Sequence, residues 1–232
     1  MRVFILIYGI FVLFLTTNSW AQNTEPNDIG AWYMYFFTTK FKESNFGIQG
    51  DVQHRNFNFL GDLEQLLLRS GLTYSPKNAN ATFTLGVAHI TTGTIGESED
   101  TFNENRIYQE ALLPQKVGSR FYITHRFRYE QRFVENQDFR TRFRYNLFLN
   151  IPINKKELVK NTIYMAFYNE LFLNGESNIG NNRRVGVFDR NRLYAGLGYG
   201  LNNSMRIQLG FMNQSIENNG KNQLQVSLHH NF

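Results

Sequence analysis

The chain has 232 residues, a formal net charge of +5 and no cysteine. The lack of cysteine excludes disulfides, thiolate zinc sites and cysteine nucleophiles. The small basic excess is spread along the chain rather than gathered in one tail, so no nucleic-acid partner is expected. Aromatic residues make up 16% of the chain, with 22 Phe and 12 Tyr, as is typical of the aromatic girdles of membrane-spanning barrels.

The first residues have the layout of a secretory signal peptide. Arg2 supplies a positive charge, Val3 to Leu15 form an apolar core, and Ser19 and Ala21 are small residues at the recognition positions for cleavage. We expect cleavage after Ala21, so that residues 1–21 are a signal peptide and residues 22–232 form one outer-membrane β-barrel domain. The apolar run is short for a spanning helix, which disfavours an N-terminal membrane anchor.

Segments in which apolar and polar residues alternate follow at regular spacing, and eleven of them are strand candidates. They are Gly30–Phe41, Phe46–Phe59, Leu63–Tyr74, Ala81–Thr91, Arg106–Leu113, the two halves of Arg120–Ile151, Asn161–Leu173, Val185–Leu201, Met205–Gln214 and Asn222–Phe232. After the signal peptide there is no other long apolar run, and the mean hydropathy is −0.40. Spanning helices are therefore not expected, which leaves a closed barrel as the one way to span a membrane. We therefore expect an all-β fold, a single antiparallel up-and-down transmembrane β-barrel. Because bacterial single-chain barrels have even strand numbers, we expect about 12 strands, with 10 as the alternative.

The loops between these strands differ in length. Thr92–Asn105 and Asn174–Arg184 are long and polar, whereas Pro114–Ser119 and Asn202–Asn203 are short. Long loops on one side and short turns on the other are expected of an outer-membrane barrel. Four acids fall in the first loop: Glu97, Glu99, Asp100 and Glu104. A calcium site is one alternative there, but the acids lack a regular ligand spacing, so a solvated loop is favoured.

The clearest two-faced segment is Arg120–Ile151. One face carries aromatic residues such as Phe127 and Phe143, and the other carries seven arginines. Each half is longer than an ordinary strand and fits the roughly 9–11 residues of a membrane-spanning one. With the polar faces of other strands, the sequence predicts a charge network in the barrel lumen, formed by Arg69, Arg106, Glu110, Arg126, Arg128, Glu130, Arg132, Arg140, Arg142, Arg144, Glu170 and Arg192.

Charges enclosed together must be paired. We therefore expect a set of arginines and a set of carboxylates to form ion pairs across the lumen. The arginines are Arg126, Arg128, Arg140, Arg142 and Arg144, and the carboxylates are Glu64, Asp51, Glu110, Glu130 and Glu170.

The last strand candidate alternates up to a terminal aromatic residue. Its apolar face is formed by Leu224, Val226, Leu228, His230 and Phe232. This pattern resembles the assembly signal of Gram-negative outer-membrane barrels. It predicts insertion by the barrel assembly machinery after export, and contact with outer-membrane lipids and lipopolysaccharide. His229 and His230 point to opposite faces of a strand and cannot chelate one ion together, so neither a metal nor a cofactor is expected.

Several motifs resemble an uncharacterised family of outer-membrane barrel proteins, domain of unknown function 2490 (DUF2490). They are Trp32 after the signal peptide; Asp62, Gln65, Arg69, Gly71 and Tyr74; Glu104, Arg106, Tyr108 and Gln109; and His125, Arg126, Arg128, Glu130 and Arg132. The resemblance extends over essentially the whole mature chain. It implies a barrel fold and an outer-membrane location, and it brings no agreed activity.

The leading functional hypothesis is a non-enzymatic outer-membrane barrel whose arginine-rich lumen is mostly plugged. One alternative is a narrow, porin-like channel that favours anions. A second is a lipid-modifying enzyme, for which Ser227 and His229 have a suitable spacing in reversed order and His125 lies on a strand with Glu130. A third is a soluble, lipocalin-type barrel with its apolar faces inward and its arginines outward. No catalytic residue is assigned.

Overall fold

The alternating segments are all β-strands, and they form one closed barrel. The computed structural model describes residues 29–96, 98–217 and 219–232, so the expected signal peptide, residues 1–21, lies outside the described residues. The strands are β1 (Gly30–Lys40), β2 (Phe46–Asn56), β3 (Leu63–Tyr74), β4 (Thr82–Gly93), β5 (Thr101–Val117), β6 (Phe121–Val134), β7 (Arg140–Pro152), β8 (Ile163–Asn174), β9 (Phe188–Gly200), β10 (Met205–Ser215) and β11 (Gly220–Asn231). Within the described residues, no helix is long and apolar enough to cross a membrane.

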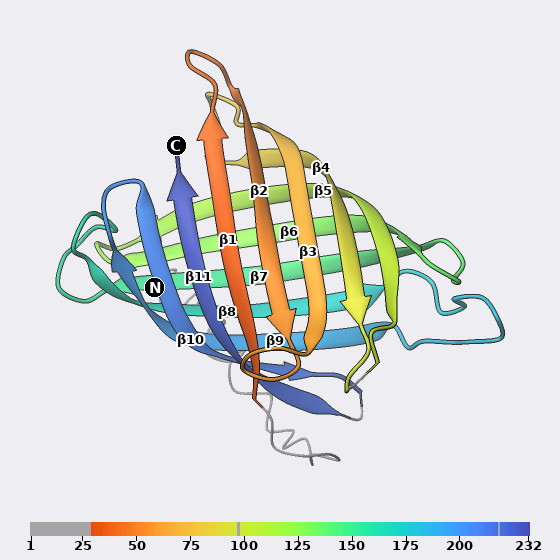
Figure 1. Ribbon diagram of the computed structural model, residues 1–232. Coiled ribbons are helices and arrows are strands. Elements are labelled where there is room, and N and C mark those ends of the chain that lie inside the picture. Colours follow the sequence, from red (N-terminus) through yellow and green to blue (C-terminus); the bar gives the residue numbers. More distant parts are fainter. Residues whose placement is uncertain (1–28, 97, 218) are drawn as a thin grey trace, which may run out of the picture.

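The barrel closes through a parallel pair of strands. Each strand is antiparallel to its neighbour in sequence, whereas β1 pairs with β11 in parallel, from Gly30↔Gln223 to Thr38↔Asn231. Figure 1 shows these two strands side by side with their arrowheads pointing the same way. The expected all-β, up-and-down barrel is therefore confirmed.

The expected strand number, 12 or 10, is wrong, because the closed barrel has eleven strands. In an up-and-down meander an odd count leaves the first and last strands running in the same direction. Their pairing is then parallel, and a parallel ladder also satisfies the backbone N–H and C=O groups. Closure of a barrel therefore does not require an even count.

Some strand boundaries also differ from the expectation. Strand β4 ends at Gly93 and β5 begins at Thr101, so the loop expected over Thr92–Asn105 is shorter. Strand β5 continues through Pro114, which pairs with Thr124 of β6 where a turn had been expected. Proline fits a strand where the ladder does not need its missing N–H.

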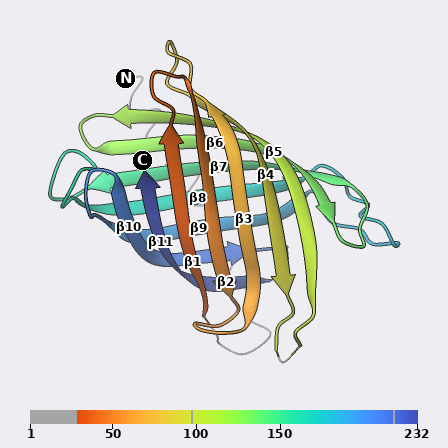
Figure 2. The ribbon, with the colours of Figure 1, turned by 45° about the horizontal axis from the view of Figure 1, so that its top comes forward.

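The connections between strands lie at two ends of the barrel, which we call the loop end and the turn end. At the loop end lie the connections 57–62, 94–100, 135–139, 175–187 and 216–219; at the turn end lie 41–45, 75–81, 118–120, 153–162 and 201–204. Figure 2 shows β2 to β5 in front of β6 to β9, with the barrel interior between these two groups. At the loop end, the connections 135–139 and 175–187 are hydrogen-bonded to each other, since Arg183 donates to the Asn136 carbonyl at 2.6 Å.

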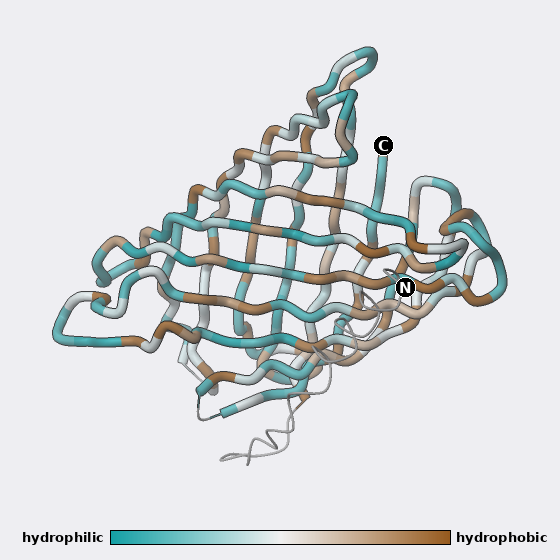
Figure 3. Tube along the Cα trace, turned by 180° about the vertical axis from the view of Figure 1, so that it is seen from behind, coloured by the Kyte–Doolittle hydropathy of each residue, from teal (hydrophilic) through white to brown (hydrophobic). Residues whose placement is uncertain are grey.

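The alternation places apolar side chains on the outer face and charged side chains on the inner face. Leu85 and Val87 on β4 are each 60% exposed, whereas Arg128 and Glu130 on β6 are 6% and 1% exposed. Figure 3 shows the change of hydropathy from residue to residue along the strands. The arrangement is thus the reverse of a lipocalin-type barrel, in which the apolar faces would point inward.

Glycines on the inner face make room for tyrosine rings of a neighbouring strand. A Cβ atom added to Gly86 would meet the Tyr108 ring, and one added to Gly198 would meet the Tyr164 ring. A row of glycines inside a strand, as in β9, marks either tight curvature or a close neighbour. The structure shows the close neighbour, an aromatic ring lying flat on the strand.

The parallel closing pair can be tested by cysteine crosslinking, because the chain has no native cysteine. Tyr33 on β1 and Val226 on β11 are register partners. Neighbouring strands lie about 4.8 Å apart, and a disulfide needs Cα atoms closer than about 7 Å. We expect the Tyr33→Cys, Val226→Cys variant to crosslink within one chain under mild oxidation, as seen by its mobility on a non-reducing gel.

The matched control is Tyr33→Cys with Leu228→Cys. Leu228 pairs with Tyr35, and this offset of two residues moves the Cα atoms to about 8 Å apart, too far for a disulfide. Efficient crosslinking of the control but not of the matched pair would contradict the parallel register.

Candidate functional site

The candidate site is the charged interior of the barrel, and the strand register builds it. On β6 and β7, charged residues occupy successive inner-face positions over 126–132 and 140–144, and β5 carries Glu104, Arg106 and Glu110 on its inner face. The register sets Glu110 beside Arg128 and Glu130 beside Arg142. Residues directly opposite on neighbouring strands have Cβ atoms about 5 Å apart, within reach of ion pairing.

Six of these side chains form a ring in which acids and arginines alternate. In order they are Glu130, Arg144, Glu170, Arg126, Glu110 and Arg128. The N–O distances along the ring are 2.6 Å for Arg144–Glu130, 2.5 Å for Arg144–Glu170, 2.6 Å for Arg126–Glu170, 3.8 Å for Arg126–Glu110 and 3.7 Å for Arg128–Glu130. Arg128 also donates to Glu110 through Nε at 2.7 Å. Every charge in this ring therefore has an opposite charge on either side.

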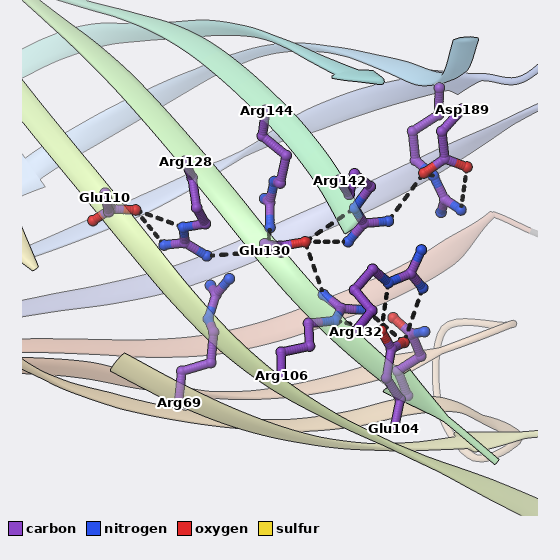
Figure 4. A network of polar contacts seen from close by, with 12 residues as sticks. Arg69, Glu104, Arg106, Glu110, Arg128, Glu130, Arg132, Arg142, Arg144 and Asp189 are labelled. Atoms are coloured by element: carbon purple, nitrogen blue, oxygen red, sulfur yellow. Dashed lines mark hydrogen bonds and ion pairs between the residues drawn. The ribbon is translucent and has the colours of Figure 1, made fainter. Parts of the chain in front are cut away.

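Glu130 is the centre of the interior charges. It is 1% exposed, and Arg142 donates to it through Nε at 3.0 Å and Nη2 at 2.7 Å. Arg106 and Arg128 lie at 3.6 and 3.7 Å. Figure 4 shows the carboxylate of Glu130 among the guanidinium groups of these arginines.

A branch of the network extends toward the loop end through Glu104. Its two oxygens accept from Nε and Nη2 of Arg106, each at 2.7 Å, and from the same two atoms of Arg132 at 2.5 and 3.0 Å. Such paired contacts are the strong form of charge-assisted hydrogen bonding. Sequence analysis had placed Glu104 in a solvated loop, and this is corrected, because β5 begins before it and turns it inward. Of the other loop acids, Glu97 lies outside the described residues.

The carboxylate partners differ in part from those expected. Asp51 binds Arg69 at 2.9 Å, and Glu64 binds Lys221 at 2.5 Å rather than an arginine of β6 or β7. Asp189, which sequence analysis did not consider, binds Arg142 at 3.0 Å. Within the described residues, Arg140 makes no ion pair within 4.0 Å. Together with the ring, these contacts define the ion-pair network: Asp51, Arg69, Glu104, Arg106, Glu110, Arg126, Arg128, Glu130, Arg132, Arg142, Arg144, Glu170 and Asp189.

Two interior arginines that lack a carboxylate partner, Arg192 and Arg55, lie over aromatic rings. Arg192 binds Gln214 at 2.8 Å, and its guanidinium lies 4.8 Å from the ring centres of both Trp32 and Phe172. Arg55 lies 3.9 Å from the Trp32 ring. Cation–π contacts of this kind stabilise a desolvated cation. The alternation that places Glu170 inward also places Phe172 inward. The sequence therefore contained the information needed to predict an aromatic ring beside the interior arginines.

The depth of burial changes along the barrel axis. Along β11, Gln223 and Gln225 are 0% and 2% exposed and Ser227 is 5% exposed, while His229, nearer the turn end, is half-buried. A cavity of about 370 Å³ lies in the interior, lined by residues that include Phe36, Arg206 and His229. The interior is thus filled toward the loop end and opens toward the turn end.

Of the residues considered for catalysis, Ser227 and His229 lie together, whereas His125 and Glu130 do not. His125 points outward and contacts the Tyr145 hydroxyl at 2.8 Å, on the opposite face of β6 from Glu130. His229 points inward and contacts Ser227 at 3.0 Å, whereas His230 points outward and contacts Tyr35 at 3.1 Å. Among the described residues, no carboxylate is hydrogen-bonded to His229, and no group of three or more His, Asp or Glu side chains could hold a metal ion.

The outward side chains of β11 include the residues expected to form the assembly signal. Leu224, Val226, Leu228 and His230 are partly exposed on the outer face, and Phe232 is 70% exposed. The rings of His230 and Phe232 lie 3.8 Å apart. Their role in assembly stays a prediction.

Comparison with protein-family models gives a match over residues 29–225 to DUF2490, described as a protein of unknown function. The chain belongs to this family. The resemblance drawn from the sequence motifs is therefore confirmed, and several of the residues that carried it, Arg106, Arg128 and Glu130 among them, lie in the ion-pair network. Comparison with curated proteins and with solved structures gave no match.

Removing the charge of Glu130 tests the ion-pair network. In Glu130→Gln, two arginines lose their closest shared carboxylate while still buried. Breaking a buried pair on one side costs about 3–5 kcal/mol. We expect a loss of this order in the free energy of unfolding, measured by urea titration of the purified protein in detergent micelles.

The control is Glu157→Gln, which makes the same chemical change at a side chain that is 68% exposed. Its effect should stay within about 0.5 kcal/mol. Equal stability of the two variants would show that the network does not stabilise the barrel.

Proposed function

We propose that this protein is an integral β-barrel of the outer membrane, non-enzymatic, with an interior plugged by the ion-pair network. It reaches the membrane after export with a cleaved signal peptide, is inserted by the barrel assembly machinery, and contacts outer-membrane lipids and lipopolysaccharide.

The observation that carries this proposal is the inverted arrangement of the two barrel faces. Large apolar side chains on the outer face, such as Leu85 and Phe211, are 60% and 59% exposed, while Arg144 and Glu170 inside are 7% and 3% exposed. A soluble protein rarely exposes a continuous apolar surface around its whole girth. In lipid the same surface is buried by acyl chains, and the fold fits the pattern of a membrane barrel.

Polar residues on the outer face support the same proposal, because they satisfy one another across strands. The contacts are His89–Asn105 at 2.8 Å, Gln109–Gln131 at 3.4 Å and Asn169–Asn191 at 2.9 Å. In a lipid environment there is no water to hydrogen-bond such groups. Pairing them removes most of the cost of placing them there.

The proposal that the interior is plugged rests on the burial of the ion pairs. The arginines of β6 and β7 bind carboxylates on neighbouring strands, and in the ring Arg144 and Arg126 share Glu170 from two different strands. Long side chains fill the lumen of a narrow barrel. Opening a water path would require separating these pairs.

The location is tested by fractionation and by gel mobility. We expect the protein in the outer-membrane fraction of the native cells, and a faster band on gels when the sample is not heated, because a folded barrel resists detergent. Recovery of a soluble periplasmic protein would overturn the proposal.

The plug is tested by planar-bilayer recording with the purified barrel. We expect no stable channel steps, because the buried ion pairs leave no continuous water path. A steady, anion-selective current that falls in Arg128→Ala would instead support the alternative of a narrow anion channel. A change in lipid A or phospholipids on gene deletion, restored by the wild type and not by His229→Ala, would support the lipid-modifying enzyme.

A further inference from the structure

The interior cavity lies on the turn-end side of the ion-pair network and is not explained by a plugged barrel. Its volume of about 370 Å³ is in the range of small-molecule sites. Its walls come from strands far apart in the sequence, with Phe36 from β1, Phe148 from β7 and Ser227 from β11. A barrel that only needs to be filled gains nothing from this space.

Two buried polar side chains at the cavity have hydrogen-bonding groups that the described protein atoms leave unused. Asn146 and Gln225 are each 2% exposed and line the cavity. The Asn146 carbonyl oxygen and the Gln225 amide nitrogen have no hydrogen-bond partner among the described residues. An unsatisfied buried polar group costs about 1–3 kcal/mol, so a ligand that accepts a hydrogen bond from the Gln225 amide would be favoured.

The charge of the cavity wall favours an anion. Seven arginines and three carboxylates line the cavity. Each of the three acids is already engaged, since Asp51 binds Arg69, Glu110 binds Arg128 and Glu170 binds Arg144. Arg206 lines the same cavity, and within the part of the chain that the structure describes it makes no ion pair within 4.0 Å.

One side of the cavity is apolar and flat. Phe36 stacks on His229 with ring centres 4.9 Å apart. Met34 lies on the same strand as Phe36, and Phe148 of β7 also lines the cavity. The Ser227 hydroxyl, next to His229 at 3.0 Å, adds a polar group beside this surface. The cavity therefore joins an unpaired cation to an aromatic surface.

We propose that this cavity is a binding site for a small organic anion that carries a flat apolar group, such as an aromatic carboxylate. Its carboxylate binds Arg206 and the free amide of Gln225, and its ring lies against Phe36 and Met34. The ligand enters from the turn end, where the interior opens. The site requires only the folded barrel, so it stands apart from the proposed membrane location.

The probe is 4-fluorobenzoate, added to the purified full-length barrel in detergent micelles and followed by ¹⁹F NMR titration. We expect saturable binding that is at least about tenfold weaker in Arg206→Gln, because a hydrogen bond to a charged group is lost. The control variant is Arg184→Gln, an exposed arginine in the connection 175–187 at the opposite end, which should bind as the wild type does.

Two further ligands test the contributions of the probe's carboxylate and of its aromatic ring separately. The uncharged 4-fluorobenzamide should bind at least about tenfold more weakly than the carboxylate, and inorganic phosphate at the same concentration should not displace the probe. Absence of saturable binding, equal binding of the amide, or equal loss in the two arginine variants would overturn the proposal. Retained heat-dependent gel mobility shows that each variant is folded.

Discussion

The interior of this barrel depends on one carboxylate. Glu130 is almost fully buried and has four guanidinium groups within 4 Å, so its negative charge is what allows those arginines to be enclosed together. Taking ions out of water is costly unless each is paired with good geometry. The alternating ring spreads this compensation over β5, β6, β7 and β8. These four consecutive strands are thereby held in register from the inside as well as by their backbone ladders, and Arg126 joins β6 directly to β8.

The excess of arginine gives the interior two kinds of wall. Where carboxylates are available the arginines form ion pairs, and where they are not, as at Arg192 and Arg55, the guanidinium lies over Trp32. The aromatic wall is built by β1 and β8 to β10, where Tyr164, Tyr194 and Met212 pack with Trp32. Polar and aromatic walls face each other across the same lumen. This explains how so basic an interior is tolerated, and why a ligand with both an anionic and an aromatic part would suit its open half.

Much of this could be predicted from the sequence, because a strand has a period of two and side chains are assigned to faces locally. The inward placement of Arg126, Arg128 and Glu130 could be predicted from the alternation of β6 alone. The strand number could not be predicted in the same way. The alternating segments indicated eleven strands, but closure is a contact between β1 and β11, at opposite ends of the chain, and no local pattern says whether it is parallel. Glu104 was misplaced for a related reason: polar residues at the start of β5 look like a loop until the ladder with β6 is known.

The odd strand number also decides where the chain enters and leaves the barrel. Because β1 and β11 run in the same direction, the chain enters at Gly30 on the loop end and leaves at Asn231 on the turn end. A barrel with an even count brings both crossings to the same rim. Here, whatever is joined before β1 and whatever is joined after β11 are delivered to opposite sides of the sheet cylinder. In a membrane those two sides are different compartments.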